Sequence, residues 1–162
     1  MKVTFLFATC LVFSSLAAGE DLLLGRWNCN SKSLDDDGSI FAGQWTSDIL
    51  ADGSAVDSGL FTMKVFDEYL IATEIEIGAV GRGTTGVIGS KVLATLSSIY
   101  VQSLVIDGTD VTRFIGEDAD IDSIVGWLKD AEGTTFTSTI LSLTETEFIT
   151  EDQDGVIEMC TR

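Results

Sequence analysis

The chain of 162 residues has no histidine and no proline, and its nine basic residues are outnumbered by 26 acidic ones. Without histidine, a Ser-His-Asp triad or a Cys-His pair cannot be built, and a zinc site would have to consist of carboxylates alone. No pair among the acidic residues stands in a context that distinguishes it as a general acid and base. The sequence therefore predicts no enzyme activity, with no catalytic residue, no cofactor and no metal site.

The scarcity of basic residues gives the chain a formal net charge of −17 at pH 7. A surface this negative repels nucleic acid and anionic lipid, and it attracts cations and basic proteins. A saline habitat or simple solubility explains such a charge more simply than a particular partner does. We expect no nucleic-acid partner.

The N-terminal residues have the pattern of a secretion signal. Lys2 precedes an apolar run over 3–16, and small residues at 17–19 come before the first acidic residue, Glu20. A charged region, an apolar region and a small-residue cleavage site follow one another in this order in signal peptides. The run is shorter than the roughly 20 residues of a transmembrane helix. We predict a signal peptide at 1–19.

Cleavage within 17–20 leaves a single domain at 20–162, which we expect to be exported, either periplasmic or secreted, without a stable membrane anchor. A domain of this size buries roughly two-thirds of the surface that its unfolded chain exposes. It is therefore large enough for an ordinary hydrophobic core.

The three cysteines divide between signal and domain. Cys10 is removed with the signal peptide, whereas Cys29 and Cys160 lie at opposite ends of the domain. In an oxidising compartment two such cysteines normally form a disulfide, and only one intramolecular pairing exists. Their spacing is not the Cys-x-x-Cys of a redox pair or metal site. We predict a Cys29–Cys160 disulfide.

Turn signals recur along the domain. Asp-Gly dipeptides, which favour hairpin turns with positive φ at both residues, occur between stretches of β-branched and aromatic residues, at Asp37-Gly38, Asp52-Gly53, Asp107-Gly108 and Asp154-Gly155. Residues between the turns alternate in polarity, so Ile75 and Ile77 share one predicted face and Glu74 and Glu76 the other. We predict strands near 25–31, 39–50, 54–66, 69–78, 98–106, 110–116, 134–143, 146–151 and 156–161.

One short helix is predicted near 120–131. Its apolar residues follow the i, i+3, i+4, i+7 spacing of a helix face, namely Ile121, Ile124, Val125 and Leu128. Asp118 or Asp120 is the expected N-terminal cap, and Gly133 is placed to end the helix.

Residues 87–96 have features of both a helix and a strand. Ile88, Val92 and Leu96 are four apart, as on a helix, but Gly86, Gly89 and the β-branched residues that follow favour a strand. We predict a strand here.

These patterns predict an all-β fold, an antiparallel meander of about 8–10 strands with one short helix. Because the chain has no proline to protect exposed strand edges, its edges must be charged, covered or closed. Closure into a β-barrel fits best, and a two-sheet sandwich is the alternative.

Two motifs suggest binding chemistry. Residues 81–86 match G-x-G-x-x-G, but the alternating polarity of the preceding strand is unlike the buried first strand of a dinucleotide-binding unit, so a glycine-rich hairpin is predicted. Acidic stretches at 35–38, 117–120 and 152–155 are predicted to be solvated turns and a helix start. Weak calcium binding by these loops is the alternative, since an EF-hand at 150–161 would lack its final glutamate.

The start of the domain resembles the lipocalins and related calycin barrels. An apolar stretch at 22–24 leads into Gly25-Arg26-Trp27, the G-x-W that opens the first strand of that family. The resemblance implies that Trp27 closes the barrel floor beside Gly25 and that a late basic residue, Arg162 or Arg113, packs over its ring. A disulfide from a late position to an early strand is also lipocalin-like. The same residues are similar to the opening of avidin-like barrels.

Two functions remain open. The first is a lipocalin-like barrel that binds a small hydrophobic ligand, since an eight-stranded barrel is just wide enough to hold one or to fill itself with side chains. The second is a protein-interaction or inhibitor module whose acidic surface binds a basic partner. We expect a monomer in either case.

Overall fold

The computed structural model describes residues 21–35, 38–66 and 71–162, so the predicted signal peptide lies outside the described residues. The elements in chain order are β1 (Gly25–Leu34), β2 (Ile40–Ile49), β3 (Ser54–Phe66), β4 (Ala72–Ile88), β5 (Lys91–Ile106), β6 (Thr109–Asp110), the 3-10 helix η1 (Thr112–Phe114), α2 (Ala119–Asp130), β7 (Thr135–Leu143), β8 (Glu147–Glu151) and β9 (Ile157–Thr161). The strand pairings are antiparallel. The prediction of an all-β fold with one short helix is confirmed.

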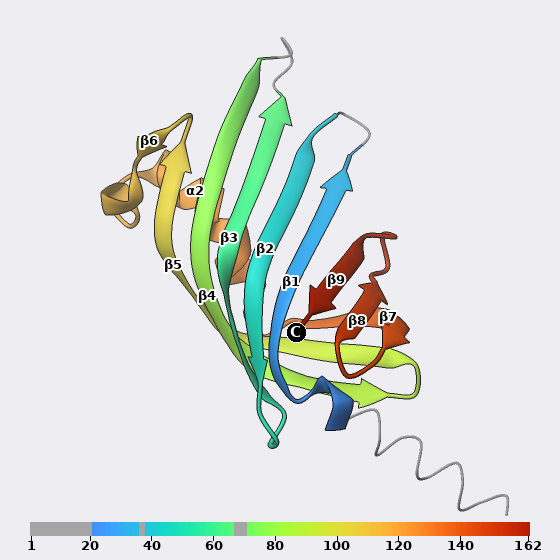
Figure 1. Ribbon diagram of the computed structural model, residues 1–162. Helices are drawn as coiled ribbons and strands as arrows, with labels where there is room; N and C mark the ends of the chain where they lie inside the picture. The colour runs from blue at the N-terminus through green and yellow to red at the C-terminus, as the bar shows by residue number, and fades with distance from the viewer. Residues whose placement is uncertain (1–20, 36–37, 67–70) are drawn as a thin grey trace, which may run out of the picture.

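The strands form one sheet that closes on itself (Figure 1). Neighbours follow the order β4-β3-β2-β1-β9-β8-β7-β5-β6, and β4 also pairs with β5. Every strand except the short β6 therefore lies in a ring. The structure is the closed antiparallel arrangement that the sequence predicts rather than the two stacked sheets of a sandwich.

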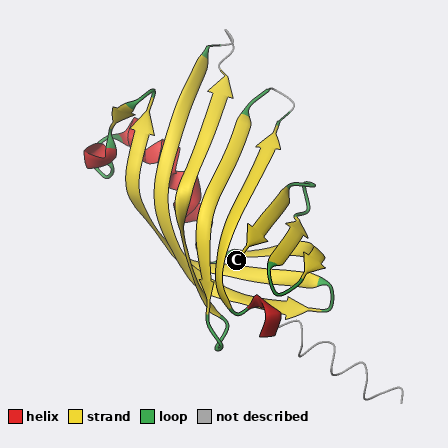
Figure 2. Ribbon diagram, in the orientation of Figure 1, coloured by secondary structure: helices red, strands yellow, loops and turns green. Residues whose placement is uncertain are grey.

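The ring is closed at one end only. β1 pairs with β9 through residues 28–31, and β5 pairs with β7 through residues 91–95. The remaining parts of the long strands β1 to β5 continue as a curved sheet, and α2 packs against one face of it (Figures 1 and 2). The molecule thus has a narrow, fully ringed end and a wide end whose inner face is covered by a helix.

Alternation along the strands builds two hydrophobic cores. The ringed end holds the cluster Leu23, Trp27, Cys29, Ile49, Ala55, Val92, Phe148 and Cys160. The helix-covered end holds the cluster Ile75, Ile77, Ala79, Leu104, Val125 and Leu128. Register places Phe61 opposite Ile77 and Met63 opposite Ile75, so the apolar side chains of β3 join the predicted apolar face of β4. Val65 and Ile71, near the ends of these strands, are instead 40 % and 64 % exposed.

Three hairpin turns share one hydrogen-bond pattern. The amide of Leu50 donates to the carbonyl oxygen of Ser54, and the amide of Gly53 donates to the carbonyl oxygen of Leu50, each at 2.9 Å. The same two bonds recur at 35–39 and at 152–156. In each turn the glycine has a positive φ. At 50–54 and 152–156, which the structure describes in full, this pattern is typical of the three-residue hairpin loop, in which a tight turn is followed by a left-handed residue.

Of the three Asp-Gly pairs that the structure describes in full, only Asp107-Gly108 is a turn of the predicted kind, with positive φ at both residues. Within the described residues, Asp107 is the one non-glycine residue with a positive φ, at 48°, and Gly108 follows at 77°. In the turn at 50–54 the aspartate has another role, because the Asp52 carboxylate accepts hydrogen bonds from the amide and the hydroxyl of Ser54 at 2.9 and 2.6 Å. Asp37, of the first pair, lies outside the described residues.

Helix α2 forms as predicted, to within a residue at each end. The Asp118 carboxylate accepts from the amides of Asp120 and Ile121, which makes Asp118 the N-terminal cap. Gly133, with φ of 80°, follows the helix end. Among the described residues, no helix is long and apolar enough to cross a membrane.

The strand predicted at 110–116 is wrong. The chain forms only the two-residue β6 there and then turns into η1. The Asp110 carboxylate accepts from the amide of Thr112 at 2.9 Å, and the Thr112 hydroxyl accepts from the amide of Leu104 at 2.8 Å. Such local side-chain bonds compete with a strand ladder and here curl the backbone against β5.

The glycine-rich hairpin predicted at 81–86 is also wrong, because this segment lies inside β4. The turn is instead at residues 89–90, so the predicted strand at 87–96 exists but is split between β4 and β5. A side chain at Gly83 would collide with the carbonyl oxygen of Thr95. Glycine therefore permits a close approach of β4 and β5 at the register shift beside Arg82.

Candidate ligand-binding site

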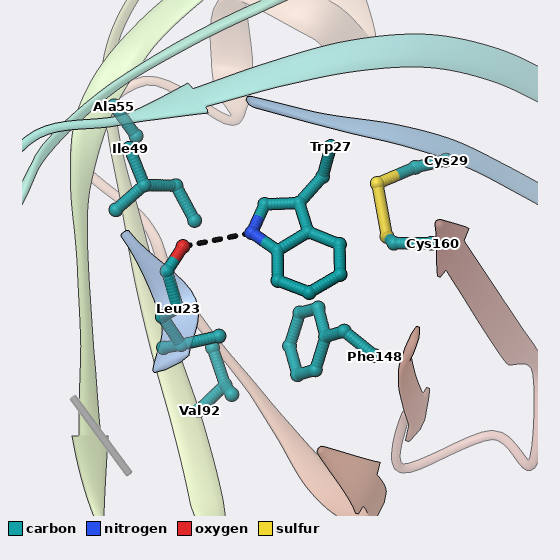
Figure 3. Packing of buried hydrophobic residues seen from close by; sticks show 8 residues of the cluster. All are labelled: Leu23, Trp27, Cys29, Ile49, Ala55, Val92, Phe148 and Cys160. Atoms are coloured by element: carbon teal, nitrogen blue, oxygen red, sulfur yellow. Dashed lines mark hydrogen bonds between the residues drawn. A yellow bond between two sulfur atoms is a disulfide. The ribbon is translucent and has the colours of Figure 1, made fainter. Parts of the chain in front are cut away.

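The ringed end is built around Trp27, whose side chain is 0 % exposed. Its indole Nε1 donates to the carbonyl oxygen of Leu23 at 2.7 Å, which ties β1 to the helical turn before it (Figure 3). The Phe148 ring lies 5.9 Å from the Trp27 ring. Pairing the indole N–H inside an apolar cluster avoids the cost of a buried unsatisfied donor. Trp27 thus fills this end of the ring with packed side chain.

Arg162 lies against this cluster at the end of the chain. Its guanidinium carbon is 3.8 Å from the centre of the Trp27 ring, and its Nη2 donates to the carbonyl oxygen of Leu22. Gly25 lies beside the same guanidinium and has φ of 108°, a conformation that favours glycine. Arg113, the other candidate, lies over a ring in η1 instead. That Gly25, Trp27 and Arg162 close the ring remains a prediction.

The predicted disulfide is present between Cys29 and Cys160. The two residues are direct partners across the β1–β9 ladder. That ladder contains only four residue pairs, whereas β1 and β2 share ten. The covalent bond therefore secures the shortest contact of β1 and holds the two ends of the domain together.

Two adjoining cavities lie inside the molecule, between the two cores. The larger, of about 310 Å³, extends beneath α2, and the smaller, of about 200 Å³, lies beside Trp27. Both are lined by Trp45, Asp57, Thr85, Ala94, Phe136 and Glu158. Because they share these residues, the two cavities are parts of one interior space.

Small residues line part of the larger cavity. Gly59 and Gly81 lie on its wall, and their strands carry Ala55 and Ala79 at other inward positions. A Cβ at Gly59 would collide with the carbonyl oxygen of Gln44 and with Trp45 of the neighbouring strand. Glycine at this position therefore lets β2 and β3 approach each other closely.

Aromatic side chains form one wall of the larger cavity. The rings of Trp45 and Phe61 stack with centres 6.2 Å apart, and Phe41 links Phe61 to Trp127 through two further contacts of 6.2 Å. Trp127 and Phe136 line the cavity, yet they are 42 % and 49 % exposed. Both residues therefore border the interior space and also meet solvent, Trp127 from α2 and Phe136 from β7.

Asp57 is one of two carboxylic acids in the interior. It lies on β3 directly opposite the buried Ser47 of β2. Burial raises the pKa of Asp57, and the nearby charge of Asp48 adds to the rise, while a hydrogen bond from the Ser47 hydroxyl lowers it. The net effect is a pKa above the ordinary value of an aspartate.

Glu158 is the other interior acid, and its setting is similar. It lies on β9 directly opposite Thr150 of β8, whose buried hydroxyl donates to the Glu158 carboxylate at 3.1 Å. Burial raises the pKa of Glu158, the Thr150 hydrogen bond lowers it, and the charges of Asp152 and Asp57 raise it further. Each interior acid thus has one hydroxyl partner across the ladder.

Neither of these acids was singled out by the sequence analysis, although a signal was available. In β9 the inward position of Cys160 implies that Glu158, two residues earlier, also points inward. In β3 the alternation that places Phe61 on the inner face extends back to Asp57. Charged residues at inward strand positions are the signal that finds them.

A wider hollow on the outside of β1, β2 and β3 is a weaker candidate. It measures about 730 Å³ and is lined largely by polar residues such as Asn28, Asn30 and Gln44. These side chains alternate with the inward-facing Trp27 and Cys29 and so point away from the core. The hollow is an open, solvated surface without an apolar wall.

Two of the three acidic stretches stabilise local structure, and the third, at 35–38, lies partly outside the described residues. The Asp118 carboxylate caps α2, and the Asp152 carboxylate accepts from the amides of Asp154 and Val156, each at 2.8 Å. These bonds occupy oxygens that a calcium ion would need. Among the described residues, no group of three or more acidic or cysteine side chains is arranged to hold a metal ion.

Comparison with known proteins finds likeness among solved structures. No family model matches the chain. No curated protein matches it either. Among solved structures, the crystal structure of a lipocalin-like protein from Bacteroides uniformis ATCC 8492 superposes with a TM-score of 0.42 at 15 % identity, covering 87 % of this chain and 98 % of that one.

Proposed function

We propose that this protein binds a small, largely apolar ligand in its interior and acts as a carrier or sensor rather than an enzyme. The observation that carries the proposal is the pair of adjoining cavities, of about 310 and 200 Å³, with an aromatic wall and a mostly apolar lining. Ligand sites are usually concave and mostly apolar, with a small number of polar groups that fix orientation. The exposed Trp127 and Phe136 provide a route in from solvent.

The test is occupancy of the cavity by a neutral apolar probe. Purified protein titrated with Nile red is expected to bind one dye per chain, with enhanced fluorescence. Ala94, which lines both cavities, is the residue to enlarge. Ala94→Phe is expected to weaken dye binding by about tenfold or more, equivalent to about 1.4 kcal/mol.

The matched control is Ala42→Phe, the same substitution on the outer face of β2. It leaves the interior unchanged and should leave dye affinity unchanged. Native mass spectrometry of the purified protein gives a second readout, since a co-purified species should be absent from Ala94→Phe. Equal dye binding by both variants and the wild type would place the dye outside the cavity and contradict the proposal.

The proposed place of action is outside the cytoplasm. The signal peptide predicted at 1–19 supports export, and the Cys29–Cys160 disulfide is typical of an oxidising compartment. N-terminal sequencing of the protein recovered from its native compartment should give a first residue within 18–20. A mature chain that retains Lys2 would contradict export by this route.

A basic protein partner is the second candidate function. The acidic excess favours it, because Arg26–Asp48 is the only salt bridge among the described residues and most carboxylates are therefore free of an internal cation. Binding to a basic protein such as lysozyme should weaken steeply as ionic strength rises. Binding that is indifferent to salt would exclude this function.

A further inference from the structure

The interior space carries charge of one sign only. Asp57 and Glu158 each line both cavities, and no lysine or arginine of the described chain lines either one. The only salt bridge among the described residues, Arg26–Asp48, lies on the outer face. The two interior carboxyl groups therefore meet in an apolar space without a cationic partner.

Such an arrangement is costly for the empty protein. A carboxylate removed from water needs a counter-charge or several hydrogen bonds, and each of these acids has a single hydroxyl partner, Ser47 for Asp57 and Thr150 for Glu158. An ionised carboxylate can accept about four hydrogen bonds, so acceptor sites remain open on both groups. A bound cation would supply both the charge and the donors.

The surroundings decide which kind of cation fits. A divalent metal ion takes six or more oxygen ligands, and among the described residues no group of three or more acidic or cysteine side chains is arranged to hold one. An organic ammonium group carries its own apolar body, which the walls formed by Trp45, Trp127 and Phe136 would accept. Aromatic faces also attract ammonium groups directly through cation–π interaction.

We propose that the interior site selects an organic cation, a small aromatic or aliphatic amine whose ammonium group lies beside Asp57 and Glu158 and whose apolar body lies among Trp45, Trp127 and Phe136. This inference rests on the proposed function, since it names the ligand class of the same cavity. The ammonium group donates to the two carboxylates, and the same acids repel carboxylate ligands such as fatty acids.

The experiment compares three probes that share one indole body: tryptamine, which is cationic, tryptophol, which is neutral, and indole-3-acetate, which is anionic. Isothermal titration of the oxidised wild-type protein at pH 7 is expected to give the tightest binding for tryptamine. A charge-assisted hydrogen bond contributes about 1.5–3 kcal/mol, so tryptamine should bind about tenfold or more tightly than tryptophol. Indole-3-acetate should bind weakest.

Variants then assign the selectivity to residues. Asp57→Asn and Glu158→Gln keep the shape of each side chain, and each should reduce the preference for tryptamine. The variant with both substitutions should bring tryptamine affinity close to that of tryptophol. Glu76→Gln is the matched control, because Glu76 lies on β4 between the buried Ile75 and Ile77 and so points to the outer face. The control should retain the full preference for tryptamine.

The outcomes distinguish failure of the cation selectivity from failure of the proposed ligand binding. Equal affinity for tryptamine and tryptophol in the wild type, together with Nile red binding, would overturn the selection of a cation while leaving the ligand-binding cavity intact. If the protein binds neither Nile red nor any of the three indoles, both the selection of a cation and the ligand-binding cavity are overturned. The wild-type comparison needs no substitution, so it decides the question even where a variant fails to fold.

Discussion

The guanidinium of Arg162 lies over the ring of Trp27, with its carbon 3.8 Å from the ring centre. The first strand of the domain is thereby covered by the last residue of the chain. The same guanidinium donates to the carbonyl oxygen of Leu22, so it holds the helical turn before β1 as well. One exposed side chain connects both ends of the domain at the narrow end of the ring.

Removing this side chain should destabilise the fold. A cation–π contact and a charge-assisted hydrogen bond are lost together in Arg162→Ala, for which we expect a loss of about 1–3 kcal/mol in the free energy of unfolding. Urea unfolding monitored by tryptophan fluorescence measures it. Arg113→Ala is the matched control, because Arg113 also lies over an aromatic ring but outside the ringed end. An equal loss of unfolding free energy in the two variants would show that the contacts of Arg162 stabilise the fold no more than those of Arg113.

The disulfide should contribute more to the free energy of unfolding than any single noncovalent contact between β1 and β9. It joins residues separated by 131 positions and secures a ladder of four residue pairs. Replacing both cysteines, as in Cys29→Ser with Cys160→Ser, should cost about 2–5 kcal/mol of stability.

The reduced wild-type protein provides the comparison for this prediction. Dithiothreitol should lower the urea midpoint of the wild type to that of the double variant and leave the variant unchanged. If a fully reduced wild type, verified by thiol titration, unfolds at its original midpoint, the disulfide does not stabilise the ring.

Much of this architecture follows from short-range patterns. The cap at Asp118 and the buried face of α2 depend on residues within one or two turns of each other, so the sequence predicted them closely. The Cys29–Cys160 bond was predictable because a single pairing was available. The ring itself followed from alternating polarity between turn signals.

The interior acids depend on long-range pairing, which no local pattern contains. The partnership of Asp57 with Ser47 requires the register of β2 against β3, and that of Glu158 with Thr150 requires β8 against β9. Their meeting in one cavity requires in addition that β9 return to β1. The strand predicted at 110–116 is wrong for the opposite reason, because a local contact decides the conformation there. The hydrogen bond from the Thr112 amide to the Asp110 carboxylate outweighs the strand propensity of the neighbouring residues.

The glycines of β4 should differ sharply in tolerance. A Cβ at Gly83 would meet the Thr95 carbonyl oxygen, a backbone atom that cannot move without shifting β5. Gly83→Ala should therefore cost about 1–3 kcal/mol, as overpacking usually does. Gly86, on the same strand, has no atom within 4 Å of such a Cβ.

Gly86→Ala is thus the control, and it should be neutral or stabilise the protein by up to about 1 kcal/mol through the lower chain entropy of alanine. Differential scanning calorimetry of both variants measures the effect. Similar melting temperatures for the two variants would show that β4 and β5 can separate at Gly83 without loss.

The two interior acids should make the empty protein less stable as the pH rises. Burial holds the pKa of Asp57 and of Glu158 above the ordinary carboxyl range, with Asp48, Asp152 and the Asp57–Glu158 pair adding to the effect. The folded state therefore binds more protons than the unfolded state from about pH 4 upward. The stability that the two protonated acids contribute is fully present below the pKa that they have in the unfolded chain. It is lost as the pH rises through their pKa in the folded protein.

The variant Asp57→Asn with Glu158→Gln should remove this part of the pH dependence. Its free energy of unfolding, measured in urea from about pH 4 to 7, should fall less than that of the wild type. Glu76→Gln should keep the wild-type slope, which separates the interior acids from general repulsion at a net charge of −17. Saturating tryptamine should restore wild-type stability more at pH 7 than at pH 4, because the ammonium group favours the ionised carboxylates that destabilise the empty protein. Parallel slopes for the double variant and the wild type would mean that the interior acids titrate like exposed ones, and the charge argument for the cavity would fail with them.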